Sequence, residues 1–187
     1  MRLERNVVAP TFVLRDVFGR TIDLASYADK KVLIAFFRHA GCPFCNLRVH
    51  LLTKLHKELQ QKGLEMIFFF ESKEQIILRS TFHQEVSPVP IISDPEKKWY
   101  DAYGLETSLF KSSMGHLTTF VQTALTAKMT GVPLHPMADG ESFSTMPAEF
   151  LLDRGLVVRE LHYSQRLSDR MDLSAIKAFA DSEAVPA

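Results

Sequence analysis

The chain contains two cysteines, and both lie in one short segment, Cys42-Pro43-Phe44-Cys45. The segment follows an apolar run over 31–37 that is typical of a strand, and it begins an amphipathic stretch that is typical of a helix. A C-x-x-C pair at the junction of a strand and a helix is typical of thiol–disulfide redox sites. We therefore expect the two cysteines to pass between a dithiol and a disulfide.

The spacing also predicts how the sulfurs ionise. If the helix begins at the motif, Cys42 is its N-cap and Pro43 takes the first helical position, where a missing N–H costs nothing. Free N–H groups and the helix dipole then favour the Cys42 thiolate, lowering its pKa from about 8.5 into a range of roughly 3.5–7.5. Cys45 lies one turn later on the same face, within reach of a disulfide. Arg38 and His39 lie just upstream and could add positive potential, although a solvent-facing loop position suits His39 equally well.

A zinc site is the first alternative for these cysteines. His39, Cys42, Cys45 and His50 could be offered as four ligands. However, His50 lies five residues beyond Cys45, so a regular helix would point its ring well away from that sulfur. No second ligand pair at the usual spacing is present, and we expect no metal and no organic cofactor.

The elements around the motif predict an α/β fold. Two apolar runs without alternation, 31–37 and 64–70, are typical of strands covered on both faces. Leucines at every fourth position from 47 to 59 predict the buried face of the helix between them. The other expected elements are an early hairpin over 11–24, a helix over 72–82, a proline-marked edge strand over 86–92, a helix with Asp94 as N-cap, a helix through 117–125, a late hairpin over 149–161 and a closing helix over 172–180.

Length and composition limit the possible classes. The 187 residues most simply form one domain, 1–187, with residues 1–30 as an N-terminal hairpin extension and residues 106–146 as an insertion. The formal net charge is zero, which argues against nucleic acid or an anionic membrane as a partner. No apolar stretch is long enough to cross a bilayer and no signal-peptide core follows the start, so we expect a cytoplasmic location. Thiols are kept reduced there, which favours a transient, catalytic cysteine pair.

Several segments resemble the thioredoxin superfamily, in particular its peroxiredoxin-like AhpC/TSA branch. Cys42-Pro43-Phe44-Cys45 is similar to the Cys-Pro-Tyr-Cys site of glutaredoxins, whereas the flanking segments resemble peroxiredoxins. The segments that carry this second resemblance are 9–24, 90–95 with 103–105, 147–153, and His162-Tyr163 with Ser168-Asp169. The resemblance implies a thioredoxin-like mixed central sheet flanked by helices, with an N-terminal β-hairpin and a helical or loop insertion before the last hairpin.

The chain departs from the peroxiredoxin pattern Pro-x-x-x-Thr-x-x-Cys. Arg38 stands at the proline position, Cys42 at the threonine position, and Cys45 at the position of the peroxide-attacking cysteine. Before the late strand, where peroxiredoxins place an arginine, Met146-Pro147 stands instead and resembles the cis-proline of thioredoxins. The resemblance thus predicts a cis bond at Pro147. Arg38 or Arg48 is our hypothesis for the missing positive charge.

These interpretations converge on a thiol–disulfide oxidoreductase or peroxiredoxin-like antioxidant protein that uses Cys42 and Cys45. Thioredoxin logic makes Cys42 the nucleophile, whereas peroxiredoxin logic gives that role to Cys45, and the helix-start electrostatics favours Cys42 for disulfide exchange. The resemblance implies a thioredoxin-like or glutathione reductant, a peroxide or disulfide substrate, and a homodimer. The alternatives are a non-enzymatic redox sensor or binding module, in which the segment 106–144 would respond to the disulfide, and a structural zinc-binding module.

Overall fold

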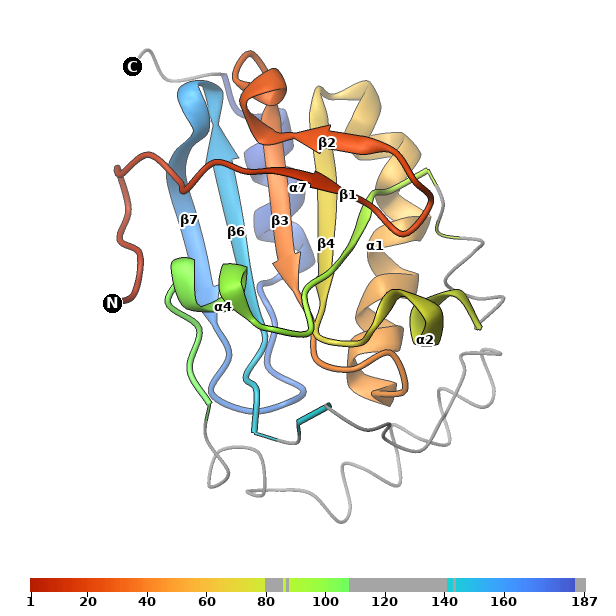
Figure 1. Cartoon of the computed structure of the whole chain (residues 1–187). Coiled ribbons are helices and arrows are strands. Elements are labelled where there is room, and N and C mark those ends of the chain that lie inside the picture. The colour runs from red at the N-terminus through yellow and green to blue at the C-terminus, as the bar shows by residue number, and fades with distance from the viewer. Residues whose placement is uncertain (80–85, 87, 108–140, 143, 184–187) are drawn as a thin grey trace.

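A five-stranded mixed sheet forms the centre of the computed structural model, which describes residues 1–79, 86, 88–107, 141–142 and 144–183 (Figure 1). The strand order is β5-β4-β3-β6-β7, with β3, β4 and β5 parallel and with β6 and β7 antiparallel to their neighbours. The strands are β3 (Lys31–Phe36), β4 (Leu64–Phe70), β5 (Ile91–Ser93), β6 (Ala148–Asp153) and β7 (Val157–Tyr163). The expected mixed α/β sheet is therefore confirmed.

One face of the sheet carries an aromatic core and the N-terminal hairpin. The hairpin pairs β1 (Val13–Arg15) with β2 (Thr21–Asp23), as expected, and the short 3-10 helix η1 (Leu24–Tyr27) follows it. Phe12 packs edge-on against Phe69 of β4 and also contacts Trp99. The residues of β3 at even positions point into this same core. Apolar side chains are thus buried on this side of the sheet without any cysteine among them.

The opposite face is covered by α1 (Pro43–Gln61) and α7 (Leu173–Asp181), which Figure 1 shows side by side behind the sheet. The second core on this side includes the odd-numbered residues of β3 together with both cysteines. Asp172 caps α7 by accepting a hydrogen bond from the Ser174 N–H, which confirms the predicted closing helix. The 3-10 turn η2 (Arg154–Leu156) joins β6 to β7 in the expected late hairpin.

The predicted buried face of α1 is observed only in part, with Leu59 buried and Leu55 packed against the core. Leu51 is 44% exposed, whereas Cys45, Val49 and Leu52 are fully buried. The register of α1 is fixed at its first turn, where the cysteine motif faces the sheet, and the positions that follow Cys45 by four and seven residues continue that face. The leucine repeat therefore lies partly beside the buried face rather than on it.

Two short elements differ from their predicted bounds. The helix expected to start at Asp94 is α4 (Lys98–Ala102), yet the Asp94 carboxylate still accepts hydrogen bonds from the N–H groups of Lys98 at 3.2 Å and Trp99 at 2.8 Å. A turn with Lys97 at a positive φ of 59° separates the aspartate from the helix. The edge strand is β5, at the edge of the sheet as predicted but starting later than residue 86.

Other predicted elements lie wholly or partly outside the described residues. The helix expected over 72–82 is α2 (Glu74–Leu78), and its continuation beyond residue 79 falls in this category. The helix through 117–125 and most of the insertion 106–146 do so as well. No helix within the described ranges is long and apolar enough to cross a bilayer.

Candidate functional site

The two cysteines lie at the carboxyl edge of the parallel strands, where α1 begins. The chain leaves β3 and turns into α1, with Cys42 as the N-cap and Pro43 in the first turn, which confirms the predicted start of the helix. Both sulfur-bearing residues are buried, Cys42 at 1% exposure and Cys45 at 0%. The two thiols contact each other through a side-chain hydrogen bond. The C-x-x-C spacing therefore brings the sulfurs together as a redox pair requires.

Arg38 contacts both sulfurs through different parts of the residue. Its guanidinium Nη1 lies 4.0 Å from the Cys42 Sγ, and its backbone N–H donates to the Cys45 Sγ at 3.4 Å. The side chain is buried, with 3% of the residue exposed. A charge held this close in a water-poor environment acts strongly on the ionisation of a thiol. The structure thus places Arg38 where the sequence hypothesis put a positive charge.

Arg170 is a second arginine at the sulfurs, and the sequence analysis missed it. Its Nη2 lies 3.8 Å from the Cys45 Sγ, and its Nη1 donates to the backbone oxygen of Asp169 at 2.7 Å. The residue precedes α7 and is separated from Cys45 by 125 positions in the chain. No local sequence pattern distinguishes it from a surface arginine, since only the packing of the β7–α7 connection brings it to the site.

The two thiols are driven apart in pKa. Burial alone would raise the pKa of Cys42, but the hydrogen bond from the Cys45 thiol, the Arg38 charge, the Cys45 backbone N–H and the Arg170 charge together lower it from an ordinary 9.0 to about 6. Burial raises the pKa of Cys45, and the adjacent Cys42 thiolate raises it further. Near neutral pH the pair therefore consists of a Cys42 thiolate that accepts a hydrogen bond from a neutral Cys45 thiol. The arginines and the Cys45 N–H in the first turn of α1 thus favour the Cys42 thiolate together.

Arg48, the other candidate for a compensating charge, is used elsewhere. Its Nε and Nη2 donate to the two carboxylate oxygens of Glu149 at 2.7 and 2.9 Å, and Nη2 also donates to the Met171 carbonyl at 2.7 Å. The Met171 N–H closes the arrangement by donating to Glu149 at 2.9 Å. This buried ion pair ties α1 to β6 and to the start of α7. The structure shows no contact between Arg48 and either sulfur.

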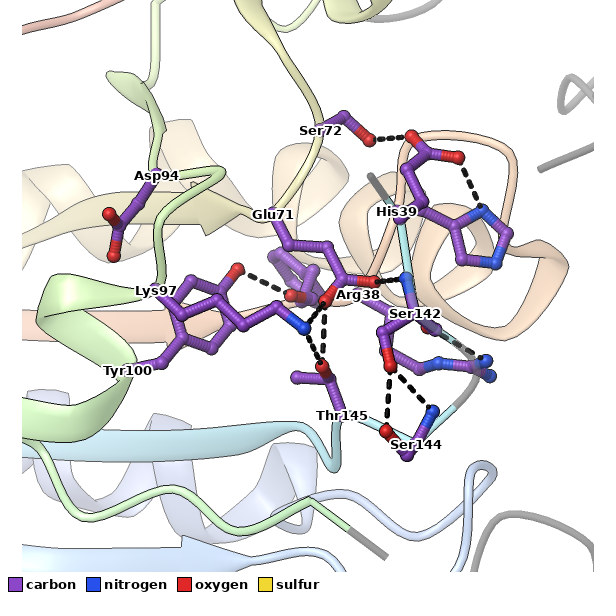
Figure 2. Close-up of polar contacts among 12 residues, drawn as sticks. Arg38, His39, Glu71, Ser72, Asp94, Lys97, Tyr100, Ser142, Ser144 and Thr145 are labelled. Carbon is purple, nitrogen blue, oxygen red and sulfur yellow. Dashed lines mark hydrogen bonds and ion pairs between the residues drawn. The ribbon is translucent and has the colours of Figure 1, made fainter. Parts of the chain in front are cut away.

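A buried carboxylate, Glu71, organises the strand-end side of the site (Figure 2). It follows β4 and accepts hydrogen bonds from the Ser142 N–H at 3.0 Å and the Thr145 hydroxyl at 2.6 Å, and it pairs with Lys97 at 3.0 Å. Arg38 donates from Nη2 to the Ser142 carbonyl oxygen at 3.4 Å. Ser142 is thus bound by Glu71 at its N–H and by Arg38 at its carbonyl, which links this part of the 106–146 insertion to the arginine that contacts Cys42.

His39 is buried, with 6% of the residue exposed, so the solvent-facing alternative was wrong. Its Nδ1 lies 3.6 Å from Glu141, and Figure 2 shows the ring directed to that carboxylate, which accepts a hydrogen bond from Ser72. Burial and the Arg38 charge lower the pKa of His39 to about 4, against the opposing effect of Glu71. A neutral ring near pH 7 adds no positive charge to the site.

Met146 shares an apolar cluster with the cysteines, but the predicted cis bond at Pro147 is wrong. Met146 is 2% exposed and belongs to the same apolar cluster as Cys42 and Cys45. All peptide bonds in the described ranges are trans, including the one before Pro147. The chain enters β6 directly there, with the Pro147 carbonyl accepting from the Ser164 N–H at 3.0 Å and Met146 donating to the Glu106 carbonyl at 3.1 Å. These backbone bonds hold the approach to β6 in an extended trans form.

The described residues contain no group of three or more histidine, cysteine, aspartate or glutamate side chains placed to hold a metal ion. Of the four ligands considered above, His39 is directed to Glu141 and only the two cysteines are brought together. The geometry therefore supports sulfur chemistry by a cysteine pair and two arginines.

Comparisons with known proteins agree with this chemistry. Thiol-disulfide oxidoreductase ResA of Halalkalibacterium halodurans is 26% identical over 124 residues, which cover 65% of this chain and 70% of the relative. The fold is similar to that of a thiol peroxidase from Chromobacterium violaceum, with a TM-score of 0.63, 15% identity, and coverage of 95% of this chain and 86% of that one. Peroxidoxin BcpB from Mycobacterium tuberculosis is similar at a TM-score of 0.64 and 15% identity, with 96% of both chains covered.

These solved structures confirm the thioredoxin-like fold, and the sequence profile of the AhpC/TSA family matches residues 6–160. The match extends over all five strands of the central sheet up to the middle of β7 and includes the cysteine motif. With its C-x-x-C pair at the start of α1, the chain belongs to the AhpC/TSA family of thioredoxin-like proteins and is a thiol-disulfide oxidoreductase or peroxidase.

Proposed function

We propose that this protein exchanges disulfides with Cys42 as the attacking nucleophile and Cys45 as the resolving thiol. The supporting observation is the opposite displacement of the two pKa values, with Cys42 lowered to about 6 and Cys45 raised. A thiolate that is formed near neutral pH is the species that attacks, since a protonated thiol is a poor nucleophile. The contact of Arg38 with Cys42 favours the same assignment.

The reaction proceeds in two displacements. The Cys42 thiolate attacks one sulfur of a substrate disulfide and expels the other sulfur as a thiolate. Cys45 loses its proton and attacks the Cys42 sulfur of the mixed disulfide, which releases the second substrate thiolate. Two electrons pass to the substrate and the protein is left with a Cys42–Cys45 disulfide, which two thiols of a thioredoxin-like or glutathione reductant return to the dithiol.

Peroxide is the second candidate substrate, and the contacts of Cys45 favour it. This residue lies at the position of the peroxide-attacking cysteine in peroxiredoxins, and it contacts the Arg38 N–H and the Arg170 guanidinium. In that reaction a Cys45 thiolate would take one peroxide oxygen and release water or hydroxide. Cys42 would then displace water from the sulfenic acid to form the same disulfide.

The discriminating experiment compares Cys42→Ser and Cys45→Ser with the reduced native protein. Each protein reacts with glutathione disulfide across a pH series, and the adduct mass is read. We expect Cys45→Ser to form a stable adduct with a rate that rises through pH 6, and Cys42→Ser to react far more slowly. Equal rates for the two variants would overturn the assignment of Cys42.

The same three proteins treated with hydrogen peroxide test the second candidate. Rapid oxidation of the native protein with loss of two protons and no gain of oxygen supports a peroxidase that resolves through the two cysteines. A rate no better than that of a free thiol leaves disulfides as the substrate.

We also propose that the protein acts in a reducing compartment such as the cytoplasm and that it forms a homodimer. Both proposals rest on the sequence and the resemblance alone.

A further inference from the structure

The charge at the two sulfurs changes when the disulfide forms. In the reduced pair the Cys42 thiolate offsets part of the positive charge of the arginines that contact the sulfurs. In the disulfide neither sulfur is charged, whereas a guanidinium keeps its charge at every physiological pH. The oxidised site is therefore more positive by one charge at the moment when a reductant has to attack it.

Among the described residues, Arg170 has no carboxylate partner for its positive charge. Its Nη1 donates to the Asp169 carbonyl at 2.7 Å and lies 3.5 Å from the Ser164 hydroxyl, while Nη2 reaches the Cys45 sulfur. Its Nε is buried and makes no hydrogen bond within the described part of the chain. The carboxylate of neighbouring Asp169 is directed elsewhere, to His162 at 2.9 Å and to the Gln165 N–H at 2.7 Å.

The Arg170 guanidinium is also accessible enough to interact electrostatically with an incoming molecule. Both sulfurs are buried, whereas Arg170, which contacts one of them, is partly exposed to solvent. The carboxylates at the far sides of the site are already engaged, since Glu149 is bound by Arg48 and Glu71 pairs with Lys97. The approach to the disulfide past Arg170 is therefore positively charged.

We propose that Arg170 makes the oxidised site select small thiol reductants that carry a carboxylate or sulfonate in addition to the thiolate. This inference rests on the proposed function, because it concerns the step that returns the disulfide to the dithiol. A second negative charge on the reductant interacts with the guanidinium during the approach, and a positive charge on the reductant is repelled.

The chemical step uses the same guanidinium. The reductant thiolate attacks the Cys42 sulfur, the bond to Cys45 breaks, and Cys45 leaves as a thiolate beside Arg170 and the Arg38 N–H. The Cys42 thiolate that raises the pKa of Cys45 in the dithiol is absent from this mixed disulfide, while the lowering effect of Arg170 persists. The thiolate of a second reductant molecule then attacks the sulfur of the first reductant molecule in the mixed disulfide. A small disulfide and the Cys42 thiolate are released, and Cys45 takes up a proton.

The test measures reduction of the oxidised protein by three probes, namely cysteamine, 2-mercaptoethanol and 3-mercaptopropionate, with each rate expressed per thiolate. We expect 3-mercaptopropionate to react about ten times faster than cysteamine at low salt, as two unit charges of opposite sign would give at this range, and the ratio to shrink at high salt. Arg170→Gln should lower the ratio about fivefold, whereas Arg170→Lys should keep most of it. Arg166→Gln is the matched control, because Arg166 is exposed in the same connection and the structure shows no contact between it and a sulfur.

The outcomes separate this inference from the function on which it rests. A ratio near ten that falls in Arg170→Gln and is kept in both Arg170→Lys and Arg166→Gln supports the selection. A ratio that is equal in the native protein and Arg170→Gln overturns it and leaves disulfide exchange standing. An oxidised native protein that none of the three thiols reduces overturns the proposed function and the selection together.

Discussion

Two arginines near the cysteine motif, Arg48 in α1 and Arg170 before α7, have opposite roles. Arg48 is enclosed by acceptors, with both carboxylate oxygens of Glu149 and the Met171 carbonyl within 2.9 Å. Arg170 reaches a sulfur at 3.8 Å and leaves its Nε without a hydrogen bond in the described structure. Arg48 is thus saturated by a carboxylate and a carbonyl, whereas Arg170 has no carboxylate partner among the described residues.

The difference shows that separate arginines stabilise the fold around the cysteines and act on the ionisation of the sulfurs. The Arg48 guanidinium donates from two nitrogens to one carboxylate, so it fixes the positions of α1, β6 and α7 while its charge is cancelled locally. The Arg170 guanidinium donates to an uncharged carbonyl and contacts a sulfur, so it keeps a field that a thiolate or an incoming anion can use. The structure thus assigns Arg48 to the architecture of the site, and Arg38 and Arg170 to its sulfurs.

The largest expected effect comes from breaking the saturated pair. Arg48→Met leaves the Glu149 carboxylate buried without its cation, and we expect the free energy of unfolding to fall by about 3–5 kcal/mol. Chemical denaturation of the reduced protein measures this loss. The alkylation rate of Cys42 against pH should keep its midpoint in the folded fraction, because Arg48 does not contact the sulfurs.

A double variant sharpens the same comparison. Arg48→Met combined with Glu149→Leu removes both charges and should recover most of the lost stability, since an apolar pair of similar volume avoids the buried charge. If the double variant is as unstable as the single one, the loss comes from packing and not from the unpaired carboxylate.

A smaller effect on the free energy of unfolding is expected when the buried His39 is protonated at low pH. The folded protein holds the pKa of His39 at about 4, whereas the unfolded chain takes up the proton near its ordinary value of 6.5. The unfolded state therefore binds the proton first as the pH falls, so stability is lost between pH 6.5 and about 4. The loss should approach about 3 kcal/mol. His39→Gln should unfold with a shallower dependence on pH in this range, and parallel curves for the two proteins would refute the assignment.

The sequence predicted the parts of this site that depend on local order. The strand–helix junction, the N-cap position of Cys42 and the first-turn Pro43 follow from a short segment whose chemistry permits few conformations, and all are observed. Arg38 was found in the same way, because it lies only four residues before Cys42. The buried face of α1 was predicted only in part, because a leucine repeat does not show which side of the helix packs against the sheet in its first turn.

The missed features depend on long-range packing. Arg170 and Glu71 come to the site from the ends of β7 and β4, and neither has a neighbouring sequence signal. The trans bond at Pro147 was missed for a related reason. The resemblance to thioredoxins predicted a cis bond from the residue type, whereas the backbone bonds to Ser164 and Glu106 support the trans form.

A still smaller effect separates Arg38 from the saturated arginine. Arg38→Met removes a charge that lowers the pKa of Cys42, so we expect that pKa to rise toward its ordinary range. Alkylation of the reduced protein near pH 6 should slow by about tenfold, which corresponds to 1.4 kcal/mol. Arg38→Lys, which retains the charge, is the control and should lose less. A Cys42 profile unchanged by Arg38→Met would make Arg38 as structural as Arg48.

The smallest effect concerns how oxidation is observed. Trp99 packs against Phe12 on the face of the sheet opposite the cysteines, so we expect its fluorescence to change little when the disulfide forms. Phe44 belongs to the cluster that contains both cysteines, and Phe44→Trp in a Trp99→Phe background should give a clear change, since a neighbouring thiolate is lost on oxidation. Both proteins are titrated with oxidant, and the disulfide is verified by mass. An equally large signal from Trp99 would mean that the redox state of the sulfurs reaches the aromatic core through the sheet, and the site would then be less isolated from the rest of the fold than its separate packing indicates.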